Sequence, residues 1–199
     1  MNGEYPRLGH YMFRCLRLSD RRLIQGAYDI AVQAHASQSR ADGSPYISHP
    51  VAVAAIVAHW STDPIVLATA LLHDVLEDTK IDAYLIRSEF GPDTLHLVHS
   101  LTKPDLSQFS SRAELVAAAH RKLLTATRED SRVAIVKIAD RLHNARTLNA
   151  LRPEARARIA NETREFYVPL ATRFGITDAA EELSRLASRV LLFATSQQV

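Results

Sequence analysis

The chain has 199 residues, of which 47% are hydrophobic and 23% charged, so it is long enough to bury a sizeable core in one domain. A formal net charge of only +2 argues against an extended basic surface for nucleic acid, but it permits a local pocket for phosphates. No apolar run reaches transmembrane length, and Glu4 and Arg7 stand where a signal peptide would be apolar. The single cysteine, Cys15, excludes an internal disulfide and fits a reducing compartment, so we predict a cytoplasmic protein.

Patterns typical of helices run through almost the whole chain. Glycine is scarce, at 6 residues, and several long stretches are rich in Ala and Leu. We predict an N-terminal arm over residues 1–18, followed by one all-α domain over residues 19–199 with about nine to ten helices. The expected helices cover residues 19–38, 50–60, 64–78, 82–90, 93–102, 111–127, 131–148, 153–173 and 177–195.

Several of these boundaries have a physical cause in the sequence. Asp63 and Pro64 form a cap-and-start pair that opens the helix before residue 78. Gly91 and Pro92 are expected to stop one helix, and Gly175 marks the break between the last two.

The segment His73-Asp74-Val75-Leu76-Glu77-Asp78 follows an apolar stretch that is typical of a buried helix. Adjacent His and Asp side chains supply two metal-ligating groups, and Glu77 lies four residues after His73, on the same face if the helix continues to Asp78. Burying four polar groups is costly without a use for them. The alternative is a helix C-terminus with solvated carboxylates, which the negative end of the helix dipole disfavours.

Two further side chains stand where helix periodicity does not explain them. His49 lies at a helix N-terminus after a polar loop, and Asp140 lies inside an otherwise apolar helix. His49 has the alternative of a backbone carbonyl partner, and Asp140 that of an ion pair with Arg141 or Arg146. Together, two His and two Asp without sulfur suit a hard or borderline octahedral ion that keeps water positions, with Mn²⁺ and Fe²⁺ ahead of a structural zinc.

Three ordered strings of residues carry a specific resemblance. They run from Arg40 to Pro50, from Leu71 to Thr79 and from Lys137 to Leu148, with a further match from Tyr167 to Ile176. The order His…His-Asp…Asp is typical of the HD superfamily of metal-dependent phosphohydrolases. Over about residues 20–178 the strings resemble the hydrolase domain of the RelA/SpoT-homologue family, and in length the chain resembles the stand-alone small alarmone hydrolases.

The resemblance implies an HD-type helical domain that removes the 3′-pyrophosphate of (p)ppGpp, giving GDP or GTP and pyrophosphate. It implies four ligands for Mn²⁺: His49, His73, Asp74 and Asp140. Glu77 and Asp78 would position or deprotonate the attacking water, a role that suits carboxylates just outside the ligand set. Three residues would stack on the base, contact the sugar–phosphate and lie near the nucleoside, respectively: Arg40, Asn144 and Thr147.

The sequence departs from the family pattern at Ala41 and Asp42, where many members have a basic residue and a serine. Asp42 could accept hydrogen bonds from guanine, or it could signal adenine alarmones, so the alternative is an HD phosphohydrolase acting on (p)ppApp or NADPH. A catalytically silent nucleotide-binding module is disfavoured by the intact Glu77 and Asp78. We expect a small-molecule nucleotide partner, no nucleic acid and no membrane; the oligomeric state stays open.

Other polar residues receive ordinary interpretations. Five histidines on predicted helices have no carboxylate at ligand spacing: His35, His59, His96, His99 and His120. We predict a structural role for His143, because its spacing from Asp140 turns it partly away. Arg121 and Lys122 are candidates for the pyrophosphate, although a solvated helix face explains them equally well. Residues 152–164 are predicted to form such a face.

Overall fold

The structure is a computed structural model that describes residues 17–104, 107 and 109–196, with the backbone alone for residues 194–196. Its helices are α2 (Leu18–Ala34), α3 (Ser48–Trp60), α4 (Pro64–Leu72), α5 (Val75–Asp78), α6 (Ala83–Leu101), α7 (Arg112–Glu129), α8 (Arg132–Arg146), η2 (Leu148–Ala150), α9 (Pro153–Glu162), η3 (Thr163–Tyr167), α10 (Val168–Arg173) and α11 (Thr177–Ser196). The predicted all-α class is confirmed. Eight of these helices in the described part have nine residues or more, slightly fewer than expected, because α5 and α10 are very short.

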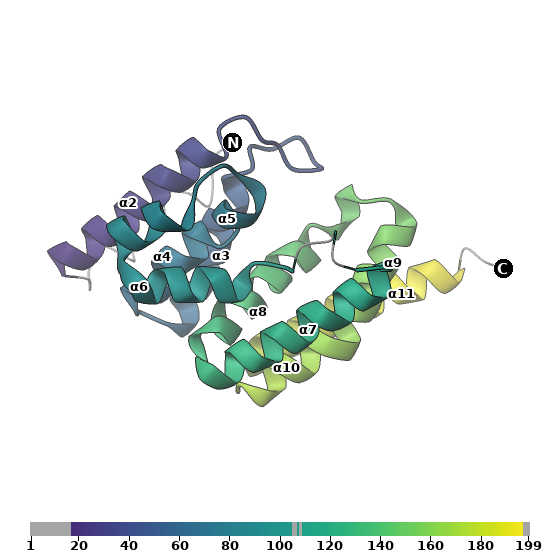
Figure 1. Cartoon of the computed structure of the whole chain (residues 1–199). Helices are drawn as coiled ribbons and strands as arrows, with labels where there is room; N and C mark the ends of the chain where they lie inside the picture. Colours follow the sequence, from purple (N-terminus) through teal and green to yellow (C-terminus); the bar gives the residue numbers. More distant parts are fainter. Residues whose placement is uncertain (1–16, 105–106, 108, 197–199) are drawn as a thin grey trace.

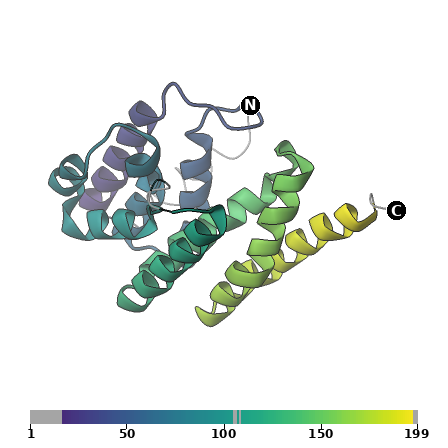
Figure 2. The same cartoon turned by 45° about the vertical axis from the view of Figure 1, so that its right-hand side comes forward.

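Helix α8 lies at the centre of the molecule. Figure 1 shows α2 to α6 on one side and α7 with α9 to α11 on the other, and Figure 2 shows the same two groups after rotation. α8 packs against α3, α4 and α6 of the first group and against α7, α10 and α11 of the second. A helix covered on several sides must be apolar around most of its circumference. The buried apolar residues of α8 meet that need: Val133, Ala134, Val136, Ile138, Ala139, Leu142 and Ala145.

The single helix predicted over residues 64–78 is divided in two. α4 ends at Leu72, His73 caps it, and Asp74 has φ −98° and ψ −7° before α5 begins. The buried apolar run of α4 stops at His73, and the carboxylates of Asp74, Glu77 and Asp78 bond to residues of other segments. Glu77 therefore does not lie one turn after His73 on a shared helix face, and that part of the prediction is wrong.

Two other helical stretches of the structure differ from the predicted ones. The segments predicted over residues 82–90 and 93–102 form one helix, α6, with a kink at Gly91, where φ is +84° and ψ 171°. The helix predicted over residues 153–173 consists of α9, the π-helical turn η3 and α10, which follow one another without a gap. Gly91 thus marks the expected break, although α6 resumes at once.

The first described helix, α2, begins and ends earlier than predicted. The predicted arm over residues 1–18, with Cys15, lies outside the described residues except for Arg17 and Leu18, where α2 begins. α2 ends at Ala34 and not near Gln38. Among the described residues, no helix combines the length and the apolar character needed to cross a membrane.

Replacement of Gly91 by Ala should destabilise the protein. The backbone there lies in a region that only glycine adopts readily, and a Cβ would meet no atom within 4 Å, so the cost is conformational. We expect Gly91→Ala to lower the free energy of unfolding by about 1–3 kcal/mol in urea denaturation. The control is Gly26→Ala in α2, where a Cβ meets Phe90 at an ordinary 3.5 Å and helix propensity improves by up to about 1 kcal/mol. Equal effects of the two substitutions would contradict this account.

Candidate active site

The four side chains predicted as metal ligands converge where α3, α4 and α8 meet. His49 comes from the first turn of α3, His73 and Asp74 from the break after α4, and Asp140 from α8. Nε2 of His49 lies 3.3 Å from Oδ1 of Asp140 and 3.5 Å from Oδ2 of Asp74. Nε2 of His73 lies 3.2 Å from Oδ2 of Asp74 and 3.9 Å from Oδ1 of Asp140. Three of the four, all except Asp74, are buried and present donor atoms within 4.8 Å of one another.

The two imidazoles are oriented by bonds at their far nitrogens. Nδ1 of His73 lies 2.8 Å from the carbonyl oxygen of Ala70, so Nδ1 donates to that oxygen and Nε2 faces the cluster. That Nε2 is buried and makes no well-directed hydrogen bond within the described residues. Nδ1 of His49 lies 2.8 Å from Nδ1 of His143. Histidines anchored in this way are typical metal ligands, so the residues fit a divalent cation.

Positive charge compensates the buried carboxylates. Asp140 accepts hydrogen bonds from Nζ of Lys137 at 2.9 Å and from Nδ2 of Asn144. Burial alone would raise the pKa of Asp140, but the Lys137 ammonium outweighs it and holds this pKa well below its usual value. Burial lowers the pKa of His73, but the carboxylate of Asp74 raises it to about 9. The cluster therefore attracts positive charge, as a cation site must.

The arginines considered as partners of Asp140 bind elsewhere. Nη2 of Arg141 lies 3.1 Å from Oε2 of Glu162, and Nη2 of Arg146 lies 2.8 Å from Oε2 of Glu182. The predicted alternative of an arginine ion pair for Asp140 is therefore wrong.

Glu162 also corrects two other expectations. It belongs to residues 152–164, which were expected to face solvent, yet it is partly buried between Arg141 and His120. Nε2 of His120 lies 3.0 Å from Oε1 of Glu162, and the His120 ring stacks on Phe166 with centroids 3.6 Å apart. His120 therefore has a carboxylate partner that sequence spacing did not indicate.

The two predicted catalytic carboxylates make different contacts. Glu77 accepts hydrogen bonds from Nζ of Lys103 at 2.7 Å and from its backbone N–H at 3.1 Å. Oδ2 of Asp78 lies 2.9 Å from the hydroxyl of Tyr46, which also lies 2.8 Å from Oδ2 of Asp74. Burial and the carboxylate of Asp74 raise the pKa of Tyr46, so its hydroxyl stays protonated. Asp78 is thus linked to the ligand cluster, whereas Glu77 is held by Lys103.

A cavity of about 700 Å³ lies over the ligand cluster, and the predicted nucleotide-binding residues line it. Nη2 of Arg40 lies 3.2 Å from Oδ1 of Asn144 and 3.2 Å from Oγ1 of Thr147, so the structure brings these three residues together. Asp42 also lines the cavity. Its Oδ1 accepts hydrogen bonds from the backbone N–H and the hydroxyl of Ser44 at 2.9 and 2.6 Å, which stabilises the loop.

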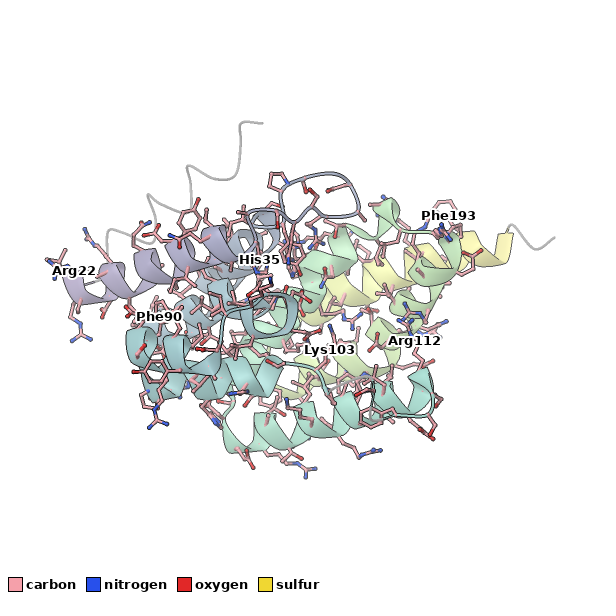
Figure 3. The ribbon with its side chains drawn as sticks, turned by 45° about the horizontal axis from the view of Figure 1, so that its top comes forward. Arg22, His35, Phe90, Lys103, Arg112 and Phe193 are labelled. Atoms are coloured by element: carbon pink, nitrogen blue, oxygen red, sulfur yellow. The ribbon has the colours of Figure 1, made fainter. Side chains whose placement is uncertain are left out.

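Much of the remaining cavity wall is basic. Lys103 and Arg112 stand at the two ends of the connection between α6 and α7, and Figure 3 labels both. Lys122, a candidate for the pyrophosphate, lines the cavity and donates to two backbone carbonyls, whereas Arg121 is exposed and is not one of the lining residues. Besides Arg40, six Lys and Arg side chains line the cavity: Lys103, Arg112, Lys122, Lys137, Arg141 and Arg158. Such a wall suits a phosphate-rich ligand.

The sequence analysis missed three residues of this site. Lys137 and His143 lie three residues before and after Asp140, and this spacing places side chains on one face of a helix. That spacing was a usable signal, and His143 contacts His49 instead of turning away. Tyr46 offered no spacing signal, because its partners are 28 and 32 residues away.

Fold and site together define a helical protein with a buried His/Asp centre suited to a divalent cation. A family model described as an HD domain matches residues 27–177. The chain belongs to the HD domain family.

Relatives with known names extend the comparison. The chain is 48% identical to "GTP pyrophosphokinase rsh" of Brucella ovis over 169 residues, which is 85% of this chain and 22% of that protein. It is 46% identical to "Bifunctional (p)ppGpp synthase/hydrolase SpoT" of Escherichia coli, covering 86% of this chain and 24% of that protein. With "Guanosine-3′,5′-bis(diphosphate) 3′-pyrophosphohydrolase" of Haemophilus influenzae, identity is 44% and the shares are 81% and 24%. The chain thus spans less than a quarter of the length of these relatives.

A solved structure shows the same fold. Its title reads "A metazoan ortholog of SpoT hydrolyzes ppGpp and plays a role in starvation responses". The match has a TM-score of 0.58 at 24% identity and covers 88% of this chain and 95% of that one.

Replacement of Asp140 by Asn should abolish metal binding. The substitution keeps the shape of the side chain but removes a ligand charge and leaves Lys137 without its carboxylate. We expect wild type to retain about one Mn²⁺ per chain after dialysis, and Asp140→Asn to lose affinity by more than the roughly 10–100-fold typical of outer-shell changes. Titration calorimetry and metal analysis measure both, with Asp29→Asn on the exposed face of α2 as the control. Full metal content in Asp140→Asn would show that the ligand set is wrong.

Proposed function

We propose that this chain is a Mn²⁺-dependent 3′-pyrophosphohydrolase of the alarmones (p)ppGpp. The observation that carries the proposal is one cavity that joins the His/Asp cluster to Arg40, Asn144 and Thr147. The names of the relatives point to the same reaction, although the chain matches only part of each.

The ion would be held by His49, His73, Asp74 and Asp140. Nitrogen and oxygen donors without sulfur favour Mn²⁺ or Fe²⁺ over a structural zinc. When bound, such an ion lowers the pKa of a coordinated water and screens the charge of the phosphate. Hydrogen bonds between His143 and His49, and from Lys137 and Asn144 to Asp140, would keep these ligands in place.

The chain's own carboxylates would manage the proton. In the hydrolysis, a water oxygen bonds to the phosphorus next to the ribose 3′-oxygen, and the bond from phosphorus to that oxygen breaks. The water loses a proton and the 3′-oxygen gains one. Asp78, which Tyr46 links to Asp74, would accept the first proton. Glu77 would position the water once an incoming phosphate competes with it for Lys103.

The nucleoside would lie against the first part of the cavity wall. The planar guanidinium of Arg40 suits stacking on a purine. Asn144 would contact the sugar–phosphate, and Thr147 would lie near the nucleoside. Arg40 is already bonded to both, so the three groups are arranged before substrate arrives.

A second candidate function is hydrolysis of another nucleotide, (p)ppApp or NADPH. Asp42 supports this second candidate, because its carboxylate lines the cavity at a position where many family members have a serine. Since Ser44 holds Oδ1 of Asp42, any contact with a base would fall to Oδ2.

The direct test is incubation of purified protein with ppGpp, pppGpp, ppApp and NADPH, with Mn²⁺ and with chelator, followed by chromatography. We expect GDP or GTP and pyrophosphate from the guanine alarmones, only with metal. Preferential cleavage of ppApp or NADPH would establish the second candidate instead. Binding of ppGpp without any product would identify a silent nucleotide-binding module.

Replacement of Arg40 by Ala should weaken binding more than turnover. Stacking stabilises the ground state and the transition state alike, so KM for ppGpp should rise while kcat changes little. A guanidinium on a base contributes about 1–2 kcal/mol when partly desolvated, which corresponds to roughly a tenfold rise in KM. Arg22→Ala, on an exposed position of α2, is the control in steady-state assays. A fall in kcat with unchanged KM would remove Arg40 from the base pocket.

A further inference from the structure

The hydroxyl of Tyr46 lies between Asp74, a proposed metal ligand, and Asp78, a proposed catalytic carboxylate. Its hydroxyl carries one proton but has two carboxylate oxygens in range, Oδ2 of Asp74 at 2.8 Å and Oδ2 of Asp78 at 2.9 Å. Asp74 belongs to the ligand cluster, and Asp78 lies at the end of α5. Among the described residues, no other side chain is hydrogen-bonded to both.

The loop before α3 fixes the backbone of Tyr46. Its N–H donates to the carbonyl of Gln38 at 3.1 Å, next to an isolated antiparallel bridge between Ser39 and Pro45. The loop between them turns at Gly43, where φ is +82°. The backbone of Tyr46 is therefore held by a loop whose two ends are hydrogen-bonded to each other.

A second group of contacts fixes the ring of Tyr46. It stacks on His35 with centroids 4.6 Å apart, and His35, labelled in Figure 3, is only 2% exposed. Nδ1 of His35 bonds to Oε1 of Gln38 at 2.7 Å, and Nε2 of Gln38 donates to the backbone carbonyl of Asp78 at 2.7 Å. The same small cluster thus holds the backbone of Asp78 through Gln38 and its carboxylate through Tyr46.

From this geometry we propose that Tyr46 is a positioning residue whose hydroxyl sets the carboxylate of Asp78 at a fixed place relative to the ligand Asp74. Two carboxylates that approach one point repel each other, and a shared hydroxyl offsets that repulsion. Without the hydroxyl, Asp78 would turn toward solvent and Asp74 would lose the partner that orients its ligating oxygen. This proposal rests on the proposed function, in which Asp78 accepts a proton from water.

The test uses Tyr46→Phe, which keeps the ring and its stack on His35 and removes only the hydroxyl. A hydrogen bond to a charged group is worth a factor of about 10–100, so kcat for ppGpp at saturating Mn²⁺ should fall by about that factor, with KM within about twofold. Tyr84→Phe, on a residue that is 78% exposed on α6, should leave kcat unchanged. An unchanged kcat in Tyr46→Phe would overturn the proposal.

A double-mutant cycle separates positioning from a general structural role. If Tyr46 acts through Asp78, Tyr46→Phe should cost about 10–100-fold in the wild-type background but less than about threefold in an Asp78→Asn background. The same fold loss in both backgrounds, or a matching fall in thermal stability, would show a structural role only and would overturn the proposal.

Metal affinity gives a readout that does not depend on the substrate. Because Tyr46 also bonds to Asp74, Tyr46→Phe should weaken Mn²⁺ binding in titration calorimetry by about 10–100-fold, the range of an outer-shell change. If wild type fails to cleave ppGpp, the proposed function falls, but this measurement still decides whether Tyr46 orients Asp74. Wild-type Mn²⁺ affinity in Tyr46→Phe would then overturn the inference by itself.

Discussion

The structure depends on keeping a carboxylate, Asp140, inside its central helix. A buried carboxylate costs several kcal/mol unless charges and hydrogen bonds compensate it. Lys137 and Asn144, one turn before and after it on α8, supply that compensation together with the imidazole of His49. α8 also contributes to the apolar core, and several helices pack against it: α3, α4, α6, α7, α10 and α11. Its polar side chains Lys137, Asp140 and Asn144 face the site.

Irregular backbone is concentrated around the same centre. The break between α4 and α5 places Asp74 next to His49 and His73, and the loop before α3 brings the hydroxyl of Tyr46 to the same carboxylate. The π-helical turn η3 follows Glu162 and ends at Tyr167, both of which line the cavity. Interruptions of regular helix are common at functional sites, because they direct side chains into positions that a straight helix does not reach.

The fold class could be predicted from the sequence because it follows from local rules, whereas the four candidate ligands were suggested by their unusual positions and by the family resemblance. Composition and helical periodicity predict helices, and Asp140 stood out as a charged residue in an apolar helix. Local rules do not predict contacts between segments that are distant in the sequence. Tyr46 meets Asp78 only after α3, α4 and α5 have packed, and Glu162 meets Arg141 only once α9 lies against α8. Residues 152–164 carry so many charges that sequence alone could not separate their inward face from their solvated one.

The charges that line the cavity bear on how a metal ion and a phosphate would bind together. The carboxylates of Asp74, Asp78 and Asp140 line the cavity together with several Lys and Arg side chains. A phosphate brought beside the carboxylates without a cation would be repelled, and in a partly desolvated cavity this repulsion is stronger than in water. A metal ion at the His/Asp cluster would reduce that repulsion. In the proposed function, metal binding and phosphate binding would therefore be coupled by electrostatics, and each would strengthen the other by the same factor.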